Sequence, residues 1–479
     1  MSAFKLHTLK QKLWAIVAAS FVARVIMFFA LPNTPSSLAP DEGTYGALAK
    51  WISESKPASN FPFFGEALYL SGRSVVIPAS TLIKFGVNEM DAVRLTSSIY
   101  GFFSLCLFAF MCSRLLQFTT SGVEENRKSE RLVVSVLLVY AFLPSHFLWS
   151  NLGLRESPNE FWLIMTFNGV FLLFKEKQNH RTWLALSICF SIICTFSSRT
   201  QVGWILVLSL ITYSCFKLRE KSSYLLIAAS VAGLMGGHVI TTPAGLLSTD
   251  VYVAKISKPA TSLDPKIPLN DGDEVKTSKL CGPTIQEIFL DGKTYICTKT
   301  GTILKENRST NLLKEGSNLI KGLSTKQVSN QAGAVSKIKR ITCPWDESSD
   351  IGIYGCLAFR APYMALTFLF RPLPFIDTTS QSSTFAAVEN MFWILMFMLI
   401  LYRISKVKKI PFLRELAPPM VFFTFYVVGA GLYEGNMGTA FRHKSLILWV
   451  PLLLLSVLFW QKDSRVKDLR GNNSQESAV

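Results

Sequence analysis

The sequence predicts an all-α polytopic membrane protein with a small soluble insertion on the outer face. Two observations support this fold class. Of the 479 residues, 49% are hydrophobic, and the mean hydropathy is +0.32. The apolar residues form runs of about 15 to 22, close to the length that crosses a hydrocarbon core of roughly 30 Å. The runs lack the alternation of barrel strands, so helices are the structures expected to satisfy the backbone in lipid.

The predicted spans fall into two groups, separated by a long polar segment. About ten are expected, each near the length of a membrane crossing. They cover residues 13–31, 92–113, 132–150, 160–174, 182–197, 201–216, 223–241, 384–402, 416–432 and 445–460. Residues 356–376 are also apolar, but they contain three prolines as well as Arg360 and Arg371. We expect them to form an interfacial or re-entrant helix on the outer face.

The net charge of +17 is distributed as a membrane topology signal. Lys and Arg cluster before the first span, in alternate loops and after the last span, at residues 5–12, 114–131, 175–181, 217–221, 403–414 and 462–470. With ten spans, all of these clusters lie on one side, as the positive-inside rule requires. Both termini are then cytoplasmic, and no nucleic-acid partner is expected. The first span lacks a good cleavage site and is interpreted as a retained anchor.

This topology divides the chain into four parts. Residues 1–241 form an N-terminal membrane module, whose first outer loop spans residues 32–91. Residues 242–355 form an outer soluble insertion, in which segment 286–296 contains Asp291-Gly292 and predicts a hairpin with a tight turn. The interfacial helix and the last membrane helices occupy 356–460, and 461–479 form a polar cytoplasmic tail expected to be disordered. No Walker loop or Gly-rich strand–turn–helix is present to bind a nucleotide.

The nine cysteines divide between membrane and outer segment. Four lie in the outer segment: Cys281, Cys297, Cys343 and Cys356. An even number in an oxidising compartment predicts two disulfides, for which three pairings exist. The local pairs, Cys281 with Cys297 and Cys343 with Cys356, are favoured. A zinc site is the alternative, although these spacings are unlike those of common zinc motifs.

A pair of carboxylates, Asp41-Glu42, follows the first span by about ten residues, beyond the length needed for the crossing. A membrane-embedded transferase needs such a water-facing carboxylate as a general base. The simpler interpretation is that Asp41 caps a helix running from Glu42 to Ser53. Either role places Asp41 at a helix start on the outer face.

Several strings together with this pair resemble the GT-C superfamily of integral-membrane glycosyltransferases. They are Asp41-Glu42, Arg155-Glu156-Ser157, Arg371-Pro372-Leu373-Pro374 and the string from Gly435 to Lys444. The chain is most similar to the bacterial branch of lipid-linked-sugar transferases related to protein mannosyltransferases and aminoarabinose transferase. The resemblance covers roughly residues 10–240 and 356–460. The insertion resembles no family that we recognise.

The resemblance implies an inverting transfer from a polyprenyl-phosphate or polyprenyl-diphosphate sugar. Asp41 would be the base and Glu42 its neighbour or a metal ligand, with Mg²⁺ or Mn²⁺ as an optional cofactor. Guanidinium groups suit the donor phosphate because they form bidentate hydrogen bonds. The candidates for that contact are Arg442, His443, Lys444, Arg155, Arg199, Arg360 and Arg371. The protein would lie in the bacterial inner membrane, with membrane lipids around it and the active site on the periplasmic face.

Other interpretations stay open at this point. Arg442 to Lys444 would also suit interfacial anchors, and Arg155-Glu156 a helix-start salt bridge. A flippase of lipid-linked sugars would share the helices and a cationic cavity, but no internal repeat is visible. A lipid-linked glycan polymerase or ligase usually has a His-containing large outer loop, which this chain lacks. The acceptor (lipid, glycan or protein) and the sugar are not specified by the sequence.

Overall fold

A computed structural model of the chain describes residues 2–34, 39, 41–62, 65–119, 126–175, 180–241, 327, 343–345, 349–374, 376–377, 381–406 and 413–460, together with four strands between 275 and 305. The chain divides into two compact units. The membrane unit comprises Met1–Thr242, Gln327–Ile341 and Arg360–Val479. The insert unit comprises Pro243–Lys326 and Thr342–Phe359.

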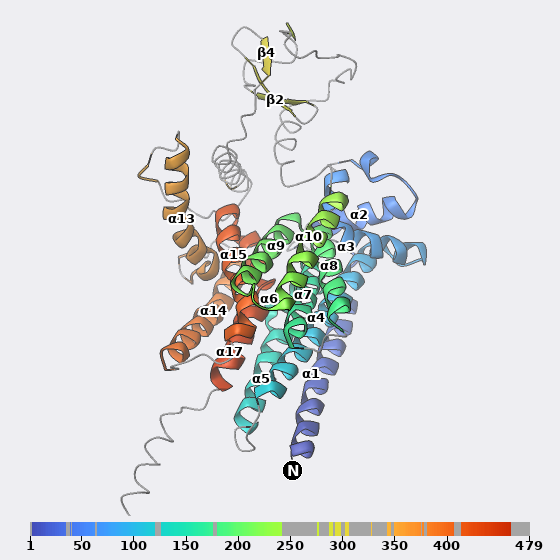
Figure 1. The fold of residues 1–479 in the computed structure, drawn as a ribbon. Helices are drawn as coiled ribbons and strands as arrows, with labels where there is room; N and C mark the ends of the chain where they lie inside the picture. Colours follow the sequence, from blue (N-terminus) through green and yellow to red (C-terminus); the bar gives the residue numbers. More distant parts are fainter. Residues whose placement is uncertain are drawn as a thin grey trace, which may run out of the picture. The chain divides into compact units, whose positions relative to one another are not determined.

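Helices make up the described part of the membrane unit (Figure 1). In chain order they are α1 (Ser2–Ala30), α2 (Asp41–Ser53), the 3-10 turn η1 (Ala58–Asn60), α3 (Gly65–Lys84), α4 (Glu89–Thr119), α5 (Asn126–Phe142), α6 (Pro144–Trp149), α7 (Glu156–Lys175), α8 (Arg181–Ser198), α9 (Thr200–Phe216), α10 (Lys221–Thr241), α13 (Asp350–Phe370), α14 (Gln381–Lys406), α15 (Leu413–Tyr433), α16 (Met437–Ser445) and α17 (Trp449–Trp460). Helices α1, α4, α7 and α8 pack in succession, each against the next. Helix α13 is shared between the two units.

The chain is a polytopic helical membrane protein. Within the described residues, seven helices are long and apolar enough to cross a membrane, or up to eight if α16 and α17 form one bent span. About ten crossings were expected, and the difference lies partly in helices that are short or interrupted. The predicted span 132–150 is divided between α5 and α6, because Pro144 has no N–H to continue the helix. The last predicted span, 445–460, corresponds to α17 and the turn before it, and α17 bends by 50° relative to α16.

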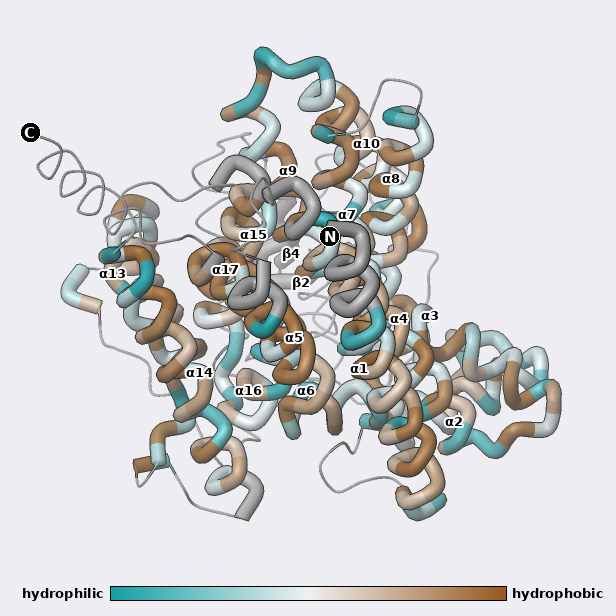
Figure 2. Tube along the Cα trace, turned by 90° about the horizontal axis from the view of Figure 1, so that it is seen from below, coloured by the Kyte–Doolittle hydropathy of each residue, from teal (hydrophilic) through white to brown (hydrophobic). Residues whose placement is uncertain are grey.

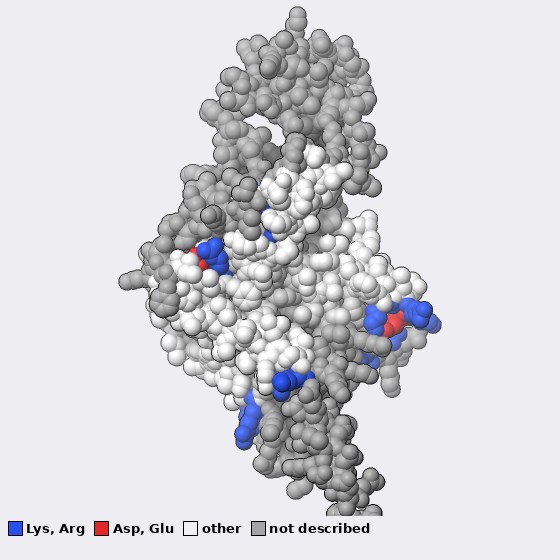
Figure 3. Space-filling model, turned by 90° about the vertical axis from the view of Figure 1, so that its left-hand side faces the viewer, with Lys and Arg blue, Asp and Glu red and all other residues white. Residues whose placement is uncertain are grey.

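The outer surface of the membrane unit is apolar, as lipid contact requires. Large side chains such as Trp14, Phe29, Phe216 and Met235 are exposed. Hydrophobic residues predominate along α5, α14 and α17 in Figure 2. On the face seen in Figure 3, the charged side chains of the described residues lie at a few separate places.

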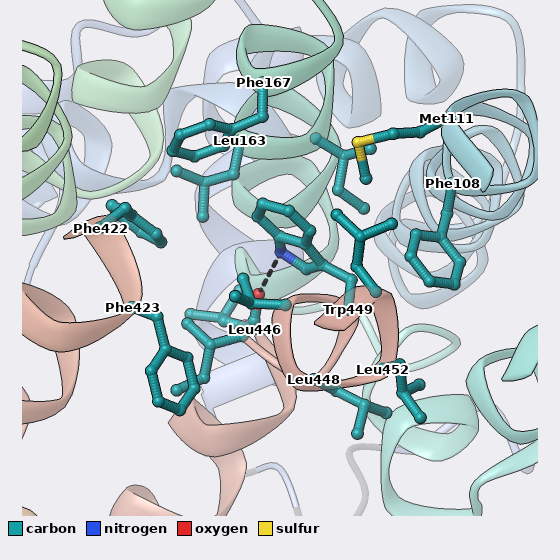
Figure 4. Packing of buried hydrophobic residues seen from close by; sticks show 14 of the residues in the cluster. Phe108, Met111, Leu163, Phe167, Phe422, Phe423, Leu446, Leu448, Trp449 and Leu452 are labelled. Carbon is teal, nitrogen blue, oxygen red and sulfur yellow. Dashed lines mark hydrogen bonds between the residues drawn. The ribbon is translucent and has the colours of Figure 1, made fainter. Parts of the chain in front are cut away.

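In the core of the membrane unit, hydrophobic side chains of several helices pack around the start of α17 (Figure 4). The Trp449 ring is fully buried, and its centroid lies 5.3 Å from that of Phe167 on α7. Its indole N–H donates to the carbonyl oxygen of Leu446 over 3.1 Å, in the bend between α16 and α17. This bond supplies the partner that a buried indole requires, while the ring contact with Phe167 packs α17 against α7.

The first loop, residues 32–91, contains more structure than the sequence predicted. Helix α2 confirms the expected helix near Glu42 to Ser53, and its two acidic residues lie in the first turn, where they favour the helix dipole. It ends before Ser55, whose φ is 61°. Helix α3 was not predicted. A Cβ at Gly72 of α3 would lie 2.7 Å from the Tyr45 ring, so this glycine permits the close packing of α3 on α2.

The insert unit contains an antiparallel four-stranded sheet of order β1-β4-β3-β2. The strands are β1 (Val275–Lys276), β2 (Glu287–Leu290), β3 (Lys293–Cys297) and β4 (Thr302–Lys305). The predicted pairing of two strands is confirmed, since Leu290 at the end of β2 pairs with Lys293 at the start of β3. The predicted disulfide between Cys343 and Cys356 is also confirmed. Cys281 and the Cys297 side chain lie outside the described residues.

Candidate functional site

Asp41 is the first residue of α2, and its side chain is 54% exposed. One of its oxygens, Oδ2, accepts from both terminal nitrogens of Arg442, from Nη1 at 3.2 Å and from Nη2 at 3.3 Å. Arg442 lies on α16, 401 residues later in the chain. The two candidates that the sequence placed in different roles, base and phosphate ligand, therefore form an ion pair.

The same guanidinium contacts a second carboxylate through its remaining nitrogen. Arg442 Nε lies 3.1 Å from Glu156 Oε1. Glu156 is the first residue of α7 and is almost completely buried. The same oxygen accepts from Arg199 Nη2 at 3.0 Å, and His443 Nε2 lies 3.7 Å away. Arg442 thus bridges an exposed carboxylate and a buried one.

Glu156 is the electrostatic centre of this group. Burial by itself raises the pKa of a carboxyl, but here the charges of Arg442, Arg199, His443 and Arg155 outweigh that effect. The result is a pKa of about 2 for Glu156, so it remains ionised at any physiological pH. Burial and the neighbouring Arg155 lower the pKa of Arg199, and Glu156 opposes that shift. A permanently charged Glu156 is what permits three arginines to lie so close together.

A buried histidine and a further carboxylate complete the group. His443 Nδ1 is hydrogen-bonded to Glu434 Oε1, and the Tyr426 hydroxyl donates to the His443 carbonyl oxygen over 3.2 Å. Burial raises the pKa of Glu434 to about 7, against the opposing charges of Arg199, Arg442 and Arg155. We call the whole group the Asp41–Arg442 cluster; it comprises Asp41, Arg155, Glu156, Arg199, Glu434, Arg442 and His443.

Short local structures position these side chains. Arg199 lies between α8 and α9 in an extended conformation, with φ of −155° and ψ of 105°. Helix α16 begins at an N-cap, where the Asn436 side chain accepts from the Gly438 N–H over 2.9 Å. Arg155 immediately precedes α7, and its Nη1 donates to the Ser71 carbonyl oxygen of α3 over 3.4 Å. The cluster is therefore built where several helices begin or end.

Glu42 does not join the cluster. Its carboxylate forms a fully buried salt bridge with Arg94 on α4 and accepts from the Gly153 N–H over 3.3 Å. Arg94 Nη1 in turn donates to the Pro32 carbonyl oxygen over 2.6 Å. These contacts fix the start of α2 against α4, and they engage the Glu42 carboxylate that the sequence offered as a neighbour of the base or a metal ligand. Among the described residues, no group of three or more Cys, His, Asp or Glu side chains is arranged to hold a metal ion.

Lys444 and Arg371 lie at a different place. The fully buried Lys444 ammonium donates to the carbonyl oxygens of Leu369, at 2.8 Å, and Arg371, at 3.0 Å, and to Asn390 Oδ1 at 2.5 Å. Its three N–H donors are thereby used, and a phosphate contact is not supported. The Arg371 guanidinium pairs with Asp377 over 2.6 Å and 3.0 Å. Arg360 is buried within α13. Of the predicted phosphate ligands, Arg155, Arg199, Arg442 and His443 come together.

Sequence reasoning did not single out Glu434. Its only signal was a carboxylate at the end of an apolar run, nine residues before His443. His146 and Glu389, by contrast, lie in separate buried polar contacts. His146 Nε2 is 3.0 Å from Glu160, and Glu389 accepts from the Ser145 backbone N–H at 2.7 Å. His146 is thus a buried hydrogen-bonded residue.

No protein-family model matches the chain, and no curated protein matches it. Among solved structures, the chain is similar to a crystal structure of ArnT from Cupriavidus metallidurans in the apo state. The two are 13% identical, and the match covers 92% of this chain and 77% of that one, with a TM-score of 0.36.

Proposed function

We propose that this membrane protein is an inverting glycosyltransferase that moves a sugar from a polyprenyl-phosphate or polyprenyl-diphosphate donor to an acceptor hydroxyl. The observation that carries the proposal is the ion pair between Asp41 and Arg442. It brings an exposed carboxylate, suited to act as a base, against a guanidinium suited to a phosphate. Both groups lie at the ends of helices in a chain with an apolar surface, where a lipid-linked substrate would present its head group.

The charge of the cluster supports an anionic ligand. Within the cluster, Arg155, Arg199 and Arg442 carry positive charge, against the carboxylates of Asp41, Glu156 and Glu434. Glu434, with a pKa of about 7, is ionised only in part. The remaining positive charge suits a phosphate group, which guanidinium groups bind through two parallel hydrogen bonds.

The proposed reaction is a single displacement. The acceptor O–H proton passes to a carboxylate oxygen of Asp41 as the acceptor oxygen forms a bond to the anomeric carbon. The bond between that carbon and the phosphate oxygen breaks, and its electron pair leaves with the phosphate, which the arginines stabilise. Attack from the side opposite the phosphate inverts the anomeric carbon. The guanidinium groups supply positive charge for the leaving group, so the proposal requires no cofactor. A dependence on Mg²⁺ or Mn²⁺ stays a prediction.

The test is sugar transfer by the protein in lipid nanodiscs, with a panel of polyprenyl-phosphate sugars and with lipid, glycan and peptide acceptors. We expect Asp41→Asn to lower the transfer rate by roughly 10²- to 10⁴-fold, the usual contribution of a positioned general base. Donor binding should be retained, because this substitution leaves the buried contact between Arg442 and Glu156 in place. Lys50→Gln is the matched control, since it removes an exposed ion pair with Glu89, 3.1 Å long, from the same helix.

Transfer by Asp41→Asn at close to the wild-type rate would exclude Asp41 as the base. If the wild-type protein binds lipid-linked sugars but transfers none of them, a flippase becomes the better interpretation, and transport across the bilayer is measured next.

A further inference from the structure

In this structure the proposed base, Asp41, and the proposed phosphate ligand, Arg442, are paired with each other. Both terminal nitrogens of Arg442, Nη1 and Nη2, are directed to Asp41 Oδ2. The Asp41 oxygen that faces the phosphate ligand is therefore already engaged by the guanidinium. Opening this ion pair frees Asp41 Oδ2 to accept the proton of an acceptor hydroxyl.

The two ion pairs of Arg442 differ in how easily they can open. The pair with Glu156 is buried, and it is anchored from the other side by Arg199, which donates to the same Glu156 oxygen over 3.0 Å. The pair with Asp41 lies at the surface of the cluster, since the Asp41 side chain is 54% exposed, and both nitrogens share one oxygen. Exposed ion pairs contribute little, because water solvates and screens both charges. The Asp41 contact is the one that a competing anion displaces.

We propose that Arg442 binds the donor phosphate and, by doing so, releases Asp41. The donor phosphate takes Nη1 and Nη2 from Asp41, while the guanidinium keeps its buried ion pair with Glu156. Asp41 is then unpaired and accepts the hydroxyl proton. This inference rests on the proposed function, and it adds an order of events: Asp41 Oδ2 is released from Arg442 when the donor binds, before the acceptor hydroxyl is deprotonated.

The exchange fits the geometry of the guanidinium group. A phosphate presents two oxygens to the Nη1 and Nη2 edge and forms a bidentate contact, whereas Asp41 offers a single oxygen to that edge. Arg199 and Arg155 add positive charge near the same point. This charge attracts a bound phosphate as well as the Asp41 carboxylate. No helix has to move for the exchange, because Arg442 keeps its buried contact.

The test is infrared difference spectroscopy of the protein in nanodiscs, with the carboxyl carbons of aspartate labelled with ¹³C. The probe is polyprenyl phosphate without a sugar, added at constant pH, and its binding is measured in parallel by calorimetry. We expect binding to shift the carboxylate stretching band of one aspartate. The shift should disappear in Asp41→Asn, and this loss assigns the band to Asp41. It should also disappear in Arg442→Gln, because this variant lacks the ion pair between residues 41 and 442. It should persist in Arg371→Gln, which removes the separate Arg371–Asp377 pair.

The outcomes separate this inference from the function on which it rests. Binding of polyprenyl phosphate without a shift of the Asp41 band would overturn the coupling and leave the transferase proposal intact. A shift that persists in Arg442→Gln would also overturn it, since the band would then report something other than this ion pair. Failure of the wild-type protein to bind any polyprenyl phosphate would overturn the coupling and the proposed donor together.

Discussion

Glu434 is the residue of the cluster whose charge changes near neutral pH. Burial raises its pKa from the ordinary 4.5 to about 7, so the folded protein holds a proton there that the unfolded chain would release. Its contribution to stability is therefore fully present below about pH 4.5 and is lost as the pH rises through 7. The same ionisation adds a negative charge beside His443 and near Arg199 and Arg442.

This titration predicts that donor binding weakens from pH 6 to pH 8, a window that brackets the Glu434 pKa of about 7. The wild-type dissociation constant should increase several-fold over this range, as ionised Glu434 offsets part of the arginine charge. Glu434→Gln should be nearly independent of pH and match the tighter, low-pH affinity of the wild type. The measurement uses a polyprenyl-phosphate sugar, whose phosphodiester keeps one charge throughout. An equal pH dependence in both proteins would assign the effect to another group.

At the scale of single elements, α13 ends inside the membrane unit at the level of the cluster. A Cβ at Gly431, near the end of α15, would lie 2.7 Å from the Met364 backbone, so α13 passes close to α15 at this glycine. Lys444, two residues from Arg442, binds the carbonyl oxygens of Leu369 and Arg371 at the end of α13. By length and composition α13 is one of the helices that could cross a membrane, whereas the sequence predicted an interfacial or re-entrant helix for residues 356–376; that assignment stays a prediction.

Lys444 is accordingly predicted to stabilise the junction of α13, α14 and α16. In Lys444→Met, the acceptors at Leu369, Arg371 and Asn390 lose their donor, at a cost on the order of 1–3 kcal/mol for each buried group left unpaired. The unfolding temperature in detergent should fall clearly, whereas polyprenyl phosphate binding by the folded fraction should be unchanged. Lys50→Met is the control and should have little effect, since an exposed ion pair contributes about 0–1 kcal/mol. If Lys444→Met binds polyprenyl phosphate more weakly but unfolds at the wild-type temperature, Lys444 has a phosphate-binding role after all.

At the scale of the whole molecule, the distribution of charge predicts two chemically different ends of the membrane unit. Arg403 and Lys406 lie in the last turn of α14, with other basic loops expected on the same side. Asp41, Arg199 and Glu434 lie at helix ends that the same topology assigns to the outer face. The confirmed Cys343–Cys356 disulfide fits an oxidising compartment for the insert unit.

Labelling of single cysteines tests this topology. In a background with the exposed Cys215 replaced by serine, Lys50→Cys should react with a membrane-impermeant maleimide in intact spheroplasts. Lys406→Cys should react only after permeabilisation, because it lies on the basic side. Both positions are exposed, so their reactivity reports sidedness and not burial. Labelling of both from the same side would contradict the predicted topology, which places them on opposite faces.

The sequence by itself determined the features that depend on neighbouring residues. Continuous apolar runs specified membrane helices, the acidic pair at 41–42 specified the start of α2, and Asp291-Gly292 specified the β2–β3 hairpin. The Cys343–Cys356 pair, 13 residues apart, was likewise accessible from local spacing. Each of these follows from backbone geometry or burial within one segment, which a linear pattern records.

Only the tertiary structure decided which charged residues meet. Arg442 reaches Asp41 across 401 residues, and Glu42 is neutralised by Arg94 across 52. From the sequence, Arg442 and Lys444 are equally good candidates for a phosphate contact. They contact different partners because different positions on a helix face different neighbours. A buried charge needs a specific partner in space, and helix packing determines which partner is available. Arg442 therefore meets Asp41 and Glu156 in the cluster, whereas Lys444 binds the carbonyl oxygens at the end of α13.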